Sequence, residues 1–238
     1  MSHEKKYEFT GETLDWVGGT LHRIRALRRF ITIDGFTVNI GDLGGWIASE
    51  KNLSQYGNCW VSGEGKVYQS ARLFDNSRVG DFAEVYNGAI LCDGAKVYNN
   101  ASVFNYSLIC GDGHVRNNAN IGGRAVVRGY VYERAAVGSN AYIGDKGVVR
   151  GVSAVNHGAL VTSTNDVITI STGPVPTTFY TMLNPTNIGI RVGVYHCGYR
   201  GEIDEFERLV MSVVDHNNDA KPFLHVISYV REHFGLNK

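Results

Sequence analysis

The stretch GAKVYNNASVFN, residues 94–105, consists of two six-residue units with one pattern. Each unit has Ala at its second position, Val at its fourth, an aromatic residue at its fifth and Asn at its sixth. Aliphatic residues continue at this spacing of six at Val61, Val67, Leu73, Val79, Val85, Leu91, Val97, Val103, Ile109, Val115, Ile121 and Val127. After a slip of two residues the spacing resumes at Val131, Val137, Ile143, Val149, Val155 and Val161. The residue two positions before each of them is Ala, Gly, Ser or Cys. We therefore interpret residues 57–162 as a six-residue repeat.

This repeat predicts a parallel β-helix. Val and Ile branch at Cβ and suit the pleated surface of a strand, so each unit contributes one buried aliphatic side chain. The small residue lies where the chain turns a corner, and Asn, Asp or Gly just before it tolerates unusual backbone angles there. Three units make one triangular coil, so the repeat builds about six coils, stacked to a length of roughly 29 Å at the spacing of hydrogen-bonded strands.

The two ends of such a stack need covers, because a β-helix exposes unpaired strand edges. Residues 20–38 alternate apolar and basic residues and contain Asp34-Gly35, which predicts a strand pair over the first coil with its turn at that dipeptide. The chain is thus divided into an N-terminal cap (1–56), a β-helix (57–162) and a small α+β domain (163–238).

The C-terminal domain is predicted from a change of pattern after Val161. Residues 166–173, 177–183 and 188–198 resemble strands, separated by turns around Pro174, Pro176 and Pro185. Two helices follow, the first burying Ile203, Phe206, Val210 and Val213, the second beginning near Pro222 and burying Phe223, Val226, Ile227, Val230 and Phe234. The pair His196-Cys197 is interpreted as a surface histidine beside a buried cysteine, because neighbours on a strand point to opposite faces.

Composition excludes several classes of function. Lys plus Arg and Asp plus Glu each number 23, so no overall charge favours nucleic acid or a membrane surface. No stretch approaches the ~20 apolar residues of a membrane span, and no apolar run follows the N-terminal lysines. The four cysteines form no CxxC pair, which argues against a zinc ribbon. We expect a cytoplasmic protein.

The repeat resembles that of hexapeptide-repeat, left-handed β-helix proteins. Residues 41–61, GDLGGWIASEKNLSQYGNCWV, resemble the entrance of a narrower bacterial and prophage-encoded group, often classed as transferases without a demonstrated reaction. The resemblance covers roughly residues 20–162. It implies a left-handed coil, a trimer and a phage origin. The chain departs from the acyltransferases of this class in its aromatic residues after the aliphatic position, at Tyr68, Phe74, Tyr86, Tyr98 and Phe104.

Acyltransferases of the resembled class use a histidine of the coils as general base and a loop that closes over coenzyme A. The coil histidines here are His114 and His157, and a base would need a partner that fixes its tautomer. Between residues 57 and 127 no inserted loop interrupts the period, so nothing obvious closes over an acyl donor. Two histidines do not make the three-histidine zinc site known on this scaffold, and we predict no metal. We expect no cofactor, with coenzyme A only under the acyltransferase alternative.

One outward column, at a step of eighteen residues, is apolar. It consists of Phe74, Cys92 and Cys110, flanked by Ile90, Leu108 and Val126. An apolar face of this extent is rarely left to water, so the N-terminal segment, the tail or a second copy covers it. We favour an oligomer seam. Cys92 and Cys110 lie in adjacent coils within disulfide range, and free thiols are the default in a reducing cytosol.

A second outward column is basic and aromatic. It carries Trp60, Arg78, Lys96 and His114, with Tyr98 and Arg116 beside it. Cations at strand spacing, mixed with aromatic rings, could hold a phosphate-bearing ligand or an acidic protein. The alternative is an ordinary solvated face whose charges Glu64 and Glu84 partly offset. We predict that the side chains of Arg78 and Lys96 point into solvent.

The sequence thus favours a non-catalytic binding or assembly protein over an acyltransferase or a purely structural module. Its predicted ligand- or partner-binding residues are Arg78, Lys96, Tyr98, His114 and Arg116. The predicted partner is a host protein or an anionic, nucleotide-like ligand, with no strong signal for nucleic acid. A phage origin would make interference with a host defence component the corresponding role.

Overall fold

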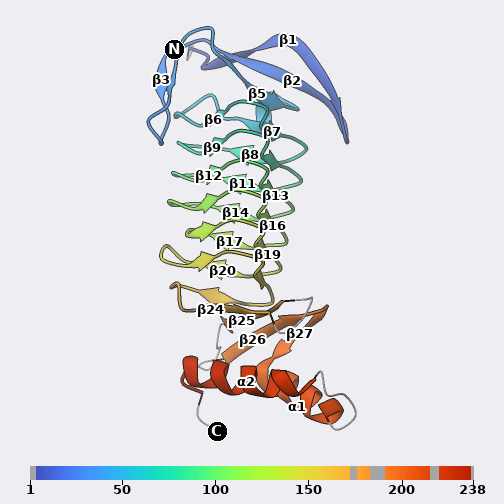
Figure 1. The fold of residues 1–238 in the computed structure, drawn as a ribbon. Coiled ribbons are helices and arrows are strands. Elements are labelled where there is room, and N and C mark those ends of the chain that lie inside the picture. The colour runs from blue at the N-terminus through green and yellow to red at the C-terminus, as the bar shows by residue number, and fades with distance from the viewer. Residues whose placement is uncertain (1–3, 172–175, 183–190, 215–219, 237–238) are drawn as a thin grey trace.

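The computed structural model describes residues 4–171, 176–182, 191–214 and 220–236. It is a parallel β-helix with an antiparallel cap at its N-terminal end and a small α+β domain at its C-terminal end (Figure 1). The predicted fold class is confirmed.

Three sheets of short parallel strands form the walls of the β-helix. Sheet 1 contains β5 (Leu43–Ile47), β7 (Lys66–Val67), β10 (Glu84–Val85), β13 (Ser102–Val103), β16 (Asn120–Ile121), β19 (Ala136–Val137) and β22 (Ala154–Val155). Sheet 2 contains β8 (Arg72–Leu73), β11 (Ile90–Leu91), β14 (Leu108–Ile109), β17 (Val126–Val127), β20 (Tyr142–Ile143) and β23 (Leu160–Val161). Sheet 3 contains β6 (Trp60–Val61), β9 (Arg78–Val79), β12 (Lys96–Val97), β15 (His114–Val115), β18 (Tyr130–Val131) and β21 (Val148–Val149).

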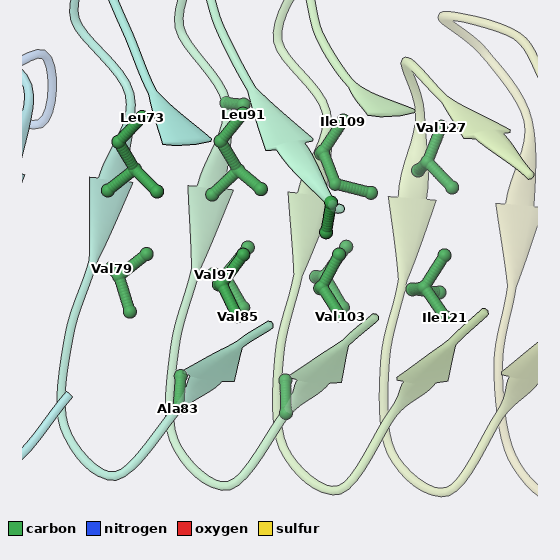
Figure 2. Close-up of a cluster of buried hydrophobic side chains, with 14 of the residues drawn as sticks. Leu73, Val79, Ala83, Val85, Leu91, Val97, Val103, Ile109, Ile121 and Val127 are labelled. Atoms are coloured by element: carbon green, nitrogen blue, oxygen red, sulfur yellow. The ribbon is translucent and has the colours of Figure 1, made fainter. Parts of the chain in front are cut away.

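The second residue of every strand from β6 to β23 is one of the aliphatic residues of the repeat, and none is more than 2% exposed. These side chains stack in straight rows along the inside of the helix, as Figure 2 shows for Leu73, Leu91, Ile109 and Val127. The first residue of each strand points outward, because successive side chains of a strand alternate between its two faces. The predicted register is therefore correct. The first residue of each of these strands lies on the outside of the β-helix, where it either faces solvent or is covered by another segment of the chain.

The corners adopt the backbone conformation that their residue types favour. Asp75, Asp81, Asn87, Asp93 and Asn99, six residues apart, all have φ between +54° and +59°. Asn and Asp tolerate this left-handed region better than other residues with a Cβ, and Gly occupies the same position at other corners.

The slip of two residues shortens one corner. Only Arg128 and Gly129 separate β17 from β18, and β15 therefore pairs with β18 at a step of sixteen residues, His114 to Tyr130. The next pairing in sheet 3, Tyr130 to Val148, returns to eighteen. The stack absorbs the slip without interrupting any of its three sheets.

The N-terminal cap is larger than the sequence indicates, and its strands pair with the strands of the coils. β1 (Tyr7–Trp16) and β2 (Gly19–Ala26) are antiparallel, and β2 pairs with β5. Because β5 already pairs in parallel with β7, parallel stacking begins before residue 57, the start that the repeat predicts. A 3-10 helix, η1 (Glu50–Asn52), follows β5.

A separate hairpin descends beside the coils. β3 (Phe30–Ile31) and β4 (Thr37–Val38) are antiparallel, with Asp34-Gly35 in the turn between them, as predicted. The hairpin does not lie across the end of the stack but along its side, next to β6 and β9 (Figure 1). The side-chain amide of Asn58 donates to the carbonyl of Ile31 and anchors the hairpin to the first coil.

The C-terminal domain closes the other end. Its sheet has the order β24 (Val167–Ile170), β25 (Thr177–Met182), β26 (Arg191–His196) and β27 (Tyr199–Glu202), and α1 (Ile203–Val214) and α2 (Lys221–His233) follow. The hydroxyl of Thr181 on β25 donates to the carbonyl of Leu160, and Tyr180 is buried in the core of the β-helix. The sequence misses β27. The predicted turns at Pro174 and Pro185 lie outside the described residues, as do residues 172–173, 183 and 188–190 of the predicted strands.

The predicted helix faces are largely correct. Ile203, Phe206 and Val210 of α1 are buried. Val213 is 41% exposed, because its neighbour Val214 is the residue of the last turn that packs against the core cluster. In α2, Ile227 and Val230 are buried, as is Phe234 just after it, while Phe223 and Val226 pack against the same cluster at its margin.

The interpretation of His196-Cys197 is wrong. His196 ends β26, its Nδ1 lies 2.7 Å from the hydroxyl of Thr177, and its ring packs against Phe206 and Phe223. Cys197 is exposed, because it enters the turn to β27 with φ +48° and no longer follows the alternation of the strand.

No helix within the described ranges is long and apolar enough to cross a membrane.

Candidate anion-binding surface

The candidate site lies on the outer face of sheet 3. Lys96 and His114 are the first residues of β12 and β15 and are directly paired in register. Tyr98 and Arg116 follow two residues later in the same coils, so the four side chains form two neighbouring rungs. The structure thus brings together four of the five residues predicted to bind a ligand or partner.

The fifth predicted residue, Arg78, is not available to solvent. It belongs to β9, one coil above Lys96, but the β3–β4 hairpin covers it and leaves only 8% of the residue exposed. Its guanidinium forms an ion pair with Asp34 in the hairpin turn and lies 4.6 Å from the ring centroid of Phe36. The prediction that Arg78 points into solvent is wrong, because the hairpin lies along the side of the coils.

Asp34 neutralises this end of the column. The carboxylate accepts hydrogen bonds from Arg78, from Thr32 and from the hydroxyl of Tyr98, the last at 2.9 Å. Partial burial alone would raise the pKa of Asp34, but these hydrogen bonds and the charge of Arg78 outweigh it and hold the pKa far below its usual range. Asp34 therefore shows that this column accepts a carboxylate where one is supplied.

The next two rungs have no such counter-charge. Among the described residues, neither Lys96 nor Arg116 forms an ion pair with Asp or Glu. Glu64 and Glu84, expected to offset the column, instead lie near Arg23 and Lys66. The guanidinium of Arg116 lies over the ring of Tyr132, 5.0 Å from the ring centroid, and Arg116 is exposed.

His114 is paired in register with Lys96 and lies two residues before Arg116. Its Nε2 is buried and has no hydrogen-bond partner. Its ring lies 5.7 Å from that of Tyr98 and 6.1 Å from that of Tyr130. Burial, and then the positive charges of Arg116 and Lys96, lower the pKa of His114 below its usual value, while Asp34 opposes them.

Tyr130 and Tyr132 extend the surface by one rung and were missed from the sequence. A step of eighteen residues from His114 and Arg116 falls on Tyr132 and Arg134, whereas the shortened corner makes the true step sixteen. The slip of two residues in the sequence was the signal that could have located them. When the outward positions are also counted with a step of sixteen residues across the slip, Tyr130 follows His114 and Tyr132 follows Arg116 in the next coil.

The predicted oligomer seam is a continuous column on sheet 2. Ile90, Leu108 and Val126 are paired in register, and Phe74, Cys92 and Cys110 lie in the corners that follow. Phe74 and Ile90 are 36% and 38% exposed, while Cys110 is buried. Tyr142 and Leu160 continue the same column to the end of the stack. An oligomer through this column stays a prediction.

We expect Leu108→Glu to disrupt such an oligomer. Leu108 lies at the middle of the column, where a carboxylate would be buried against its copy or left facing apolar side chains. Light scattering should show the wild type as an oligomer and the variant as monomer or aggregate. Ser102→Glu is the control, because Ser102 is the first residue of β13 in sheet 1, on another face of the β-helix. This variant should have the same oligomer mass as the wild type. A monomeric wild type would contradict the seam.

The remaining candidates do not join the site. His157 is exposed in the turn between β22 and β23, with φ +43°, on a different edge of the β-helix from His114. Cys92 lies near Asp75 and Asp93, with ligand atoms within 4.8 Å of one another, a grouping that the sequence did not suggest. Both carboxylates accept backbone N–H groups of the next coil, at Asp93 and Gly111, which gives them a structural role in the stack.

No protein-family model matches the chain, and no curated protein matches it either.

Proposed function

We propose that this protein is a non-catalytic binding protein whose β-helix presents Lys96, His114 and Arg116 to an anionic, nucleotide-like ligand. One observation carries the proposal. On the outer face of sheet 3, Asp34 neutralises Arg78, the cation nearest the cap, while Lys96 in the next coil and Arg116 beside His114 have no acidic partner in the described chain. The Nε2 of His114 has no hydrogen-bond partner.

The aromatic side chains favour a ligand with a ring as well as a charge. Tyr130 is 43% exposed and lies beside His114, while Tyr132 lies under Arg116. Phosphate oxygens accept hydrogen bonds from a guanidinium and an ammonium, and a base stacks on tyrosine. A rigid scaffold lowers the cost of binding, because the side chains are already held in place.

The resemblance of residues 41–61 to prophage-encoded proteins extends the proposal to its setting. A phage-derived binding protein with this surface could act on a host defence pathway by sequestering a nucleotide-like signal.

We expect Lys96→Glu/Arg116→Glu to weaken binding of a nucleoside diphosphate by roughly 100-fold or more, because two charge-assisted contacts become repulsive. Isothermal titration calorimetry at low salt measures the affinity. Folding should be unaffected, since Arg116 is exposed and Lys96 is half-buried without an ion pair.

Arg72→Glu/Arg124→Glu is the matched control. It makes the same change in net charge at exposed residues outside sheet 3. The proposal fails if both double variants lose affinity equally, which would indicate a general charge effect, or if the wild type binds none of inorganic pyrophosphate, nucleoside diphosphates and cyclic dinucleotides.

A further inference from the structure

A lysine and a cysteine meet in the interior beneath the N-terminal cap. Lys6 and Cys59 are both 0% exposed. The Nζ of Lys6 lies 3.2 Å from the Sγ of Cys59 and donates at 2.8 Å to the carbonyl of Cys59. Among the described residues no carboxylate pairs with Lys6. A fully buried lysine without a counter-charge is rare, because removing an ammonium from water is costly.

The surroundings favour the uncharged form of both groups. Burial lowers the pKa of Lys6, and the charge of Arg28 acts in the same direction, although Cys59 opposes it. Burial likewise raises the pKa of the Cys59 thiol. An uncharged amine keeps the lone pair that makes it a nucleophile.

We propose that Lys6 and Cys59 form an oxidant-sensitive modification site, at which a peroxide joins Nζ to Sγ covalently. Among the described residues, none of the other three cysteines forms a hydrogen bond with a lysine. No other pair of described residues combines a fully buried amine with a thiol at this distance.

The reaction balances in two steps. The uncharged amine of Lys6, 3.2 Å from Sγ, accepts the thiol proton, and the resulting thiolate attacks an oxygen of hydrogen peroxide to give the sulfenic acid. The O–O bond breaks, and the leaving hydroxide takes the proton back from Lys6 as water. The amine of Lys6 then attacks the sulfenic sulfur, forms an N–S bond, and releases the hydroxyl with one amine proton as a second water. A second equivalent of peroxide can instead couple the amine to the sulfenic oxygen, giving an N–O–S bridge and two waters. Two equivalents of a thiol reductant return the N–S form to amine and thiol and become a disulfide.

The cross-link would fasten the cap to the first coil. Lys6 directly precedes β1 and Cys59 directly precedes β6. Closing the chain between residues 6 and 59 restricts the unfolded state as a disulfide does. We expect the oxidised protein to melt roughly 10 °C higher than the reduced one.

Peptide mapping of the full-length wild type tests the proposal. After treatment with hydrogen peroxide and blocking of free thiols, trypsin should release residues 6–23 joined to residues 52–66. The mass should equal the sum of both peptides less two hydrogens, or that value plus one oxygen for the N–O–S bridge. Either mass supports the cross-link, and dithiothreitol should restore the separate peptides.

Exposed Cys197 reports within the same sample that peroxide has reacted. The proposal is overturned if Cys197 is oxidised while residues 7–23 and 52–66 are recovered as separate peptides, whether Cys59 is then a free thiol or a sulfinic acid. Lys6→Met and Cys59→Ala are expected to lose both the joined peptide and the rise in melting temperature. The wild-type map decides the matter even if neither variant folds.

Discussion

Gly129→Ala is expected to lower the free energy of unfolding by about 3 kcal/mol. Gly129 lies in the shortened corner between β17 and β18, where a Cβ would approach the carbonyl oxygens of Gly144 and Gly147 to under 3.0 Å. Both obstacles are backbone atoms of the next coil, so they can move only if the stack itself shifts. Most other corners accept Ala at the equivalent position, as at Ala101.

Gly138→Ala is the matched control for this prediction. The Cβ at residue 138 would also come within 3.0 Å of another atom, but that atom is Oδ1 of Asn156, at the end of a side chain that can rotate away. Thermal unfolding should show a loss of roughly 10 °C for Gly129→Ala and little change for Gly138→Ala. Equal melting temperatures for the two variants would contradict the register assigned around the slip.

Asp34→Ala is expected to destabilise the protein by about 2 to 4 kcal/mol, because it leaves the guanidinium of Arg78 covered and without a counter-charge. The side chain of Arg78 is only 10% exposed, and its Nε already lacks a partner. The variant also removes the acceptor of the Tyr98 hydroxyl. Denaturant titration measures the difference in unfolding free energy.

The control for Asp34→Ala is Glu8→Ala, which breaks the exposed ion pair with Arg25 and should change stability by about 0.5 kcal/mol or less. The pH dependence gives a second check. Because the pKa of Asp34 is depressed in the folded state, its contribution is present above the unfolded-state pKa of about 4 and is lost as pH falls below it. In Asp34→Ala the free energy of unfolding should fall less at low pH than in the wild type. An unchanged pH dependence would argue against the ion pair of Asp34 with Arg78.

The sequence predicts the β-helix well because the repeat is a direct consequence of packing. One aliphatic side chain per strand fills the interior, and the corner before it admits only a small residue, so both columns persist through every coil. Cross-coil hydrogen bonds then follow from the period alone. The cap and β27 are less predictable, since their strands are held by contacts with distant segments and carry no period of their own.

The candidate site shows where such periodic reasoning fails. The period locates Lys96 and His114 on one face, because outward positions repeat with the aliphatic ones. It says nothing about a hairpin some forty residues earlier in the chain, which covers Arg78 through a turn that carries Asp34. Tyr130 was missed for a different reason, since the slip changes the step from eighteen to sixteen. Coverage by a distant segment and local breaks in the repeat are both seen only in the three-dimensional structure.

We propose that an anionic ligand binds beside Lys96 and Arg116, close to the partly buried ring of His114. The most direct test is to titrate His114 by two-dimensional NMR, with and without a saturating nucleoside diphosphate, using His114→Gln to assign its resonance. Asp34 in the hairpin, Lys96 and Arg116 are the charges that face this ring, beside Tyr98 and Tyr130. The free protein should show a pKa of His114 below the usual 6.5, because burial and two cations disfavour the imidazolium.

A bound anion should raise the pKa of His114, so that affinity for the anion increases as pH falls through this range. A ligand that binds while the His114 titration stays where it was would contradict the account.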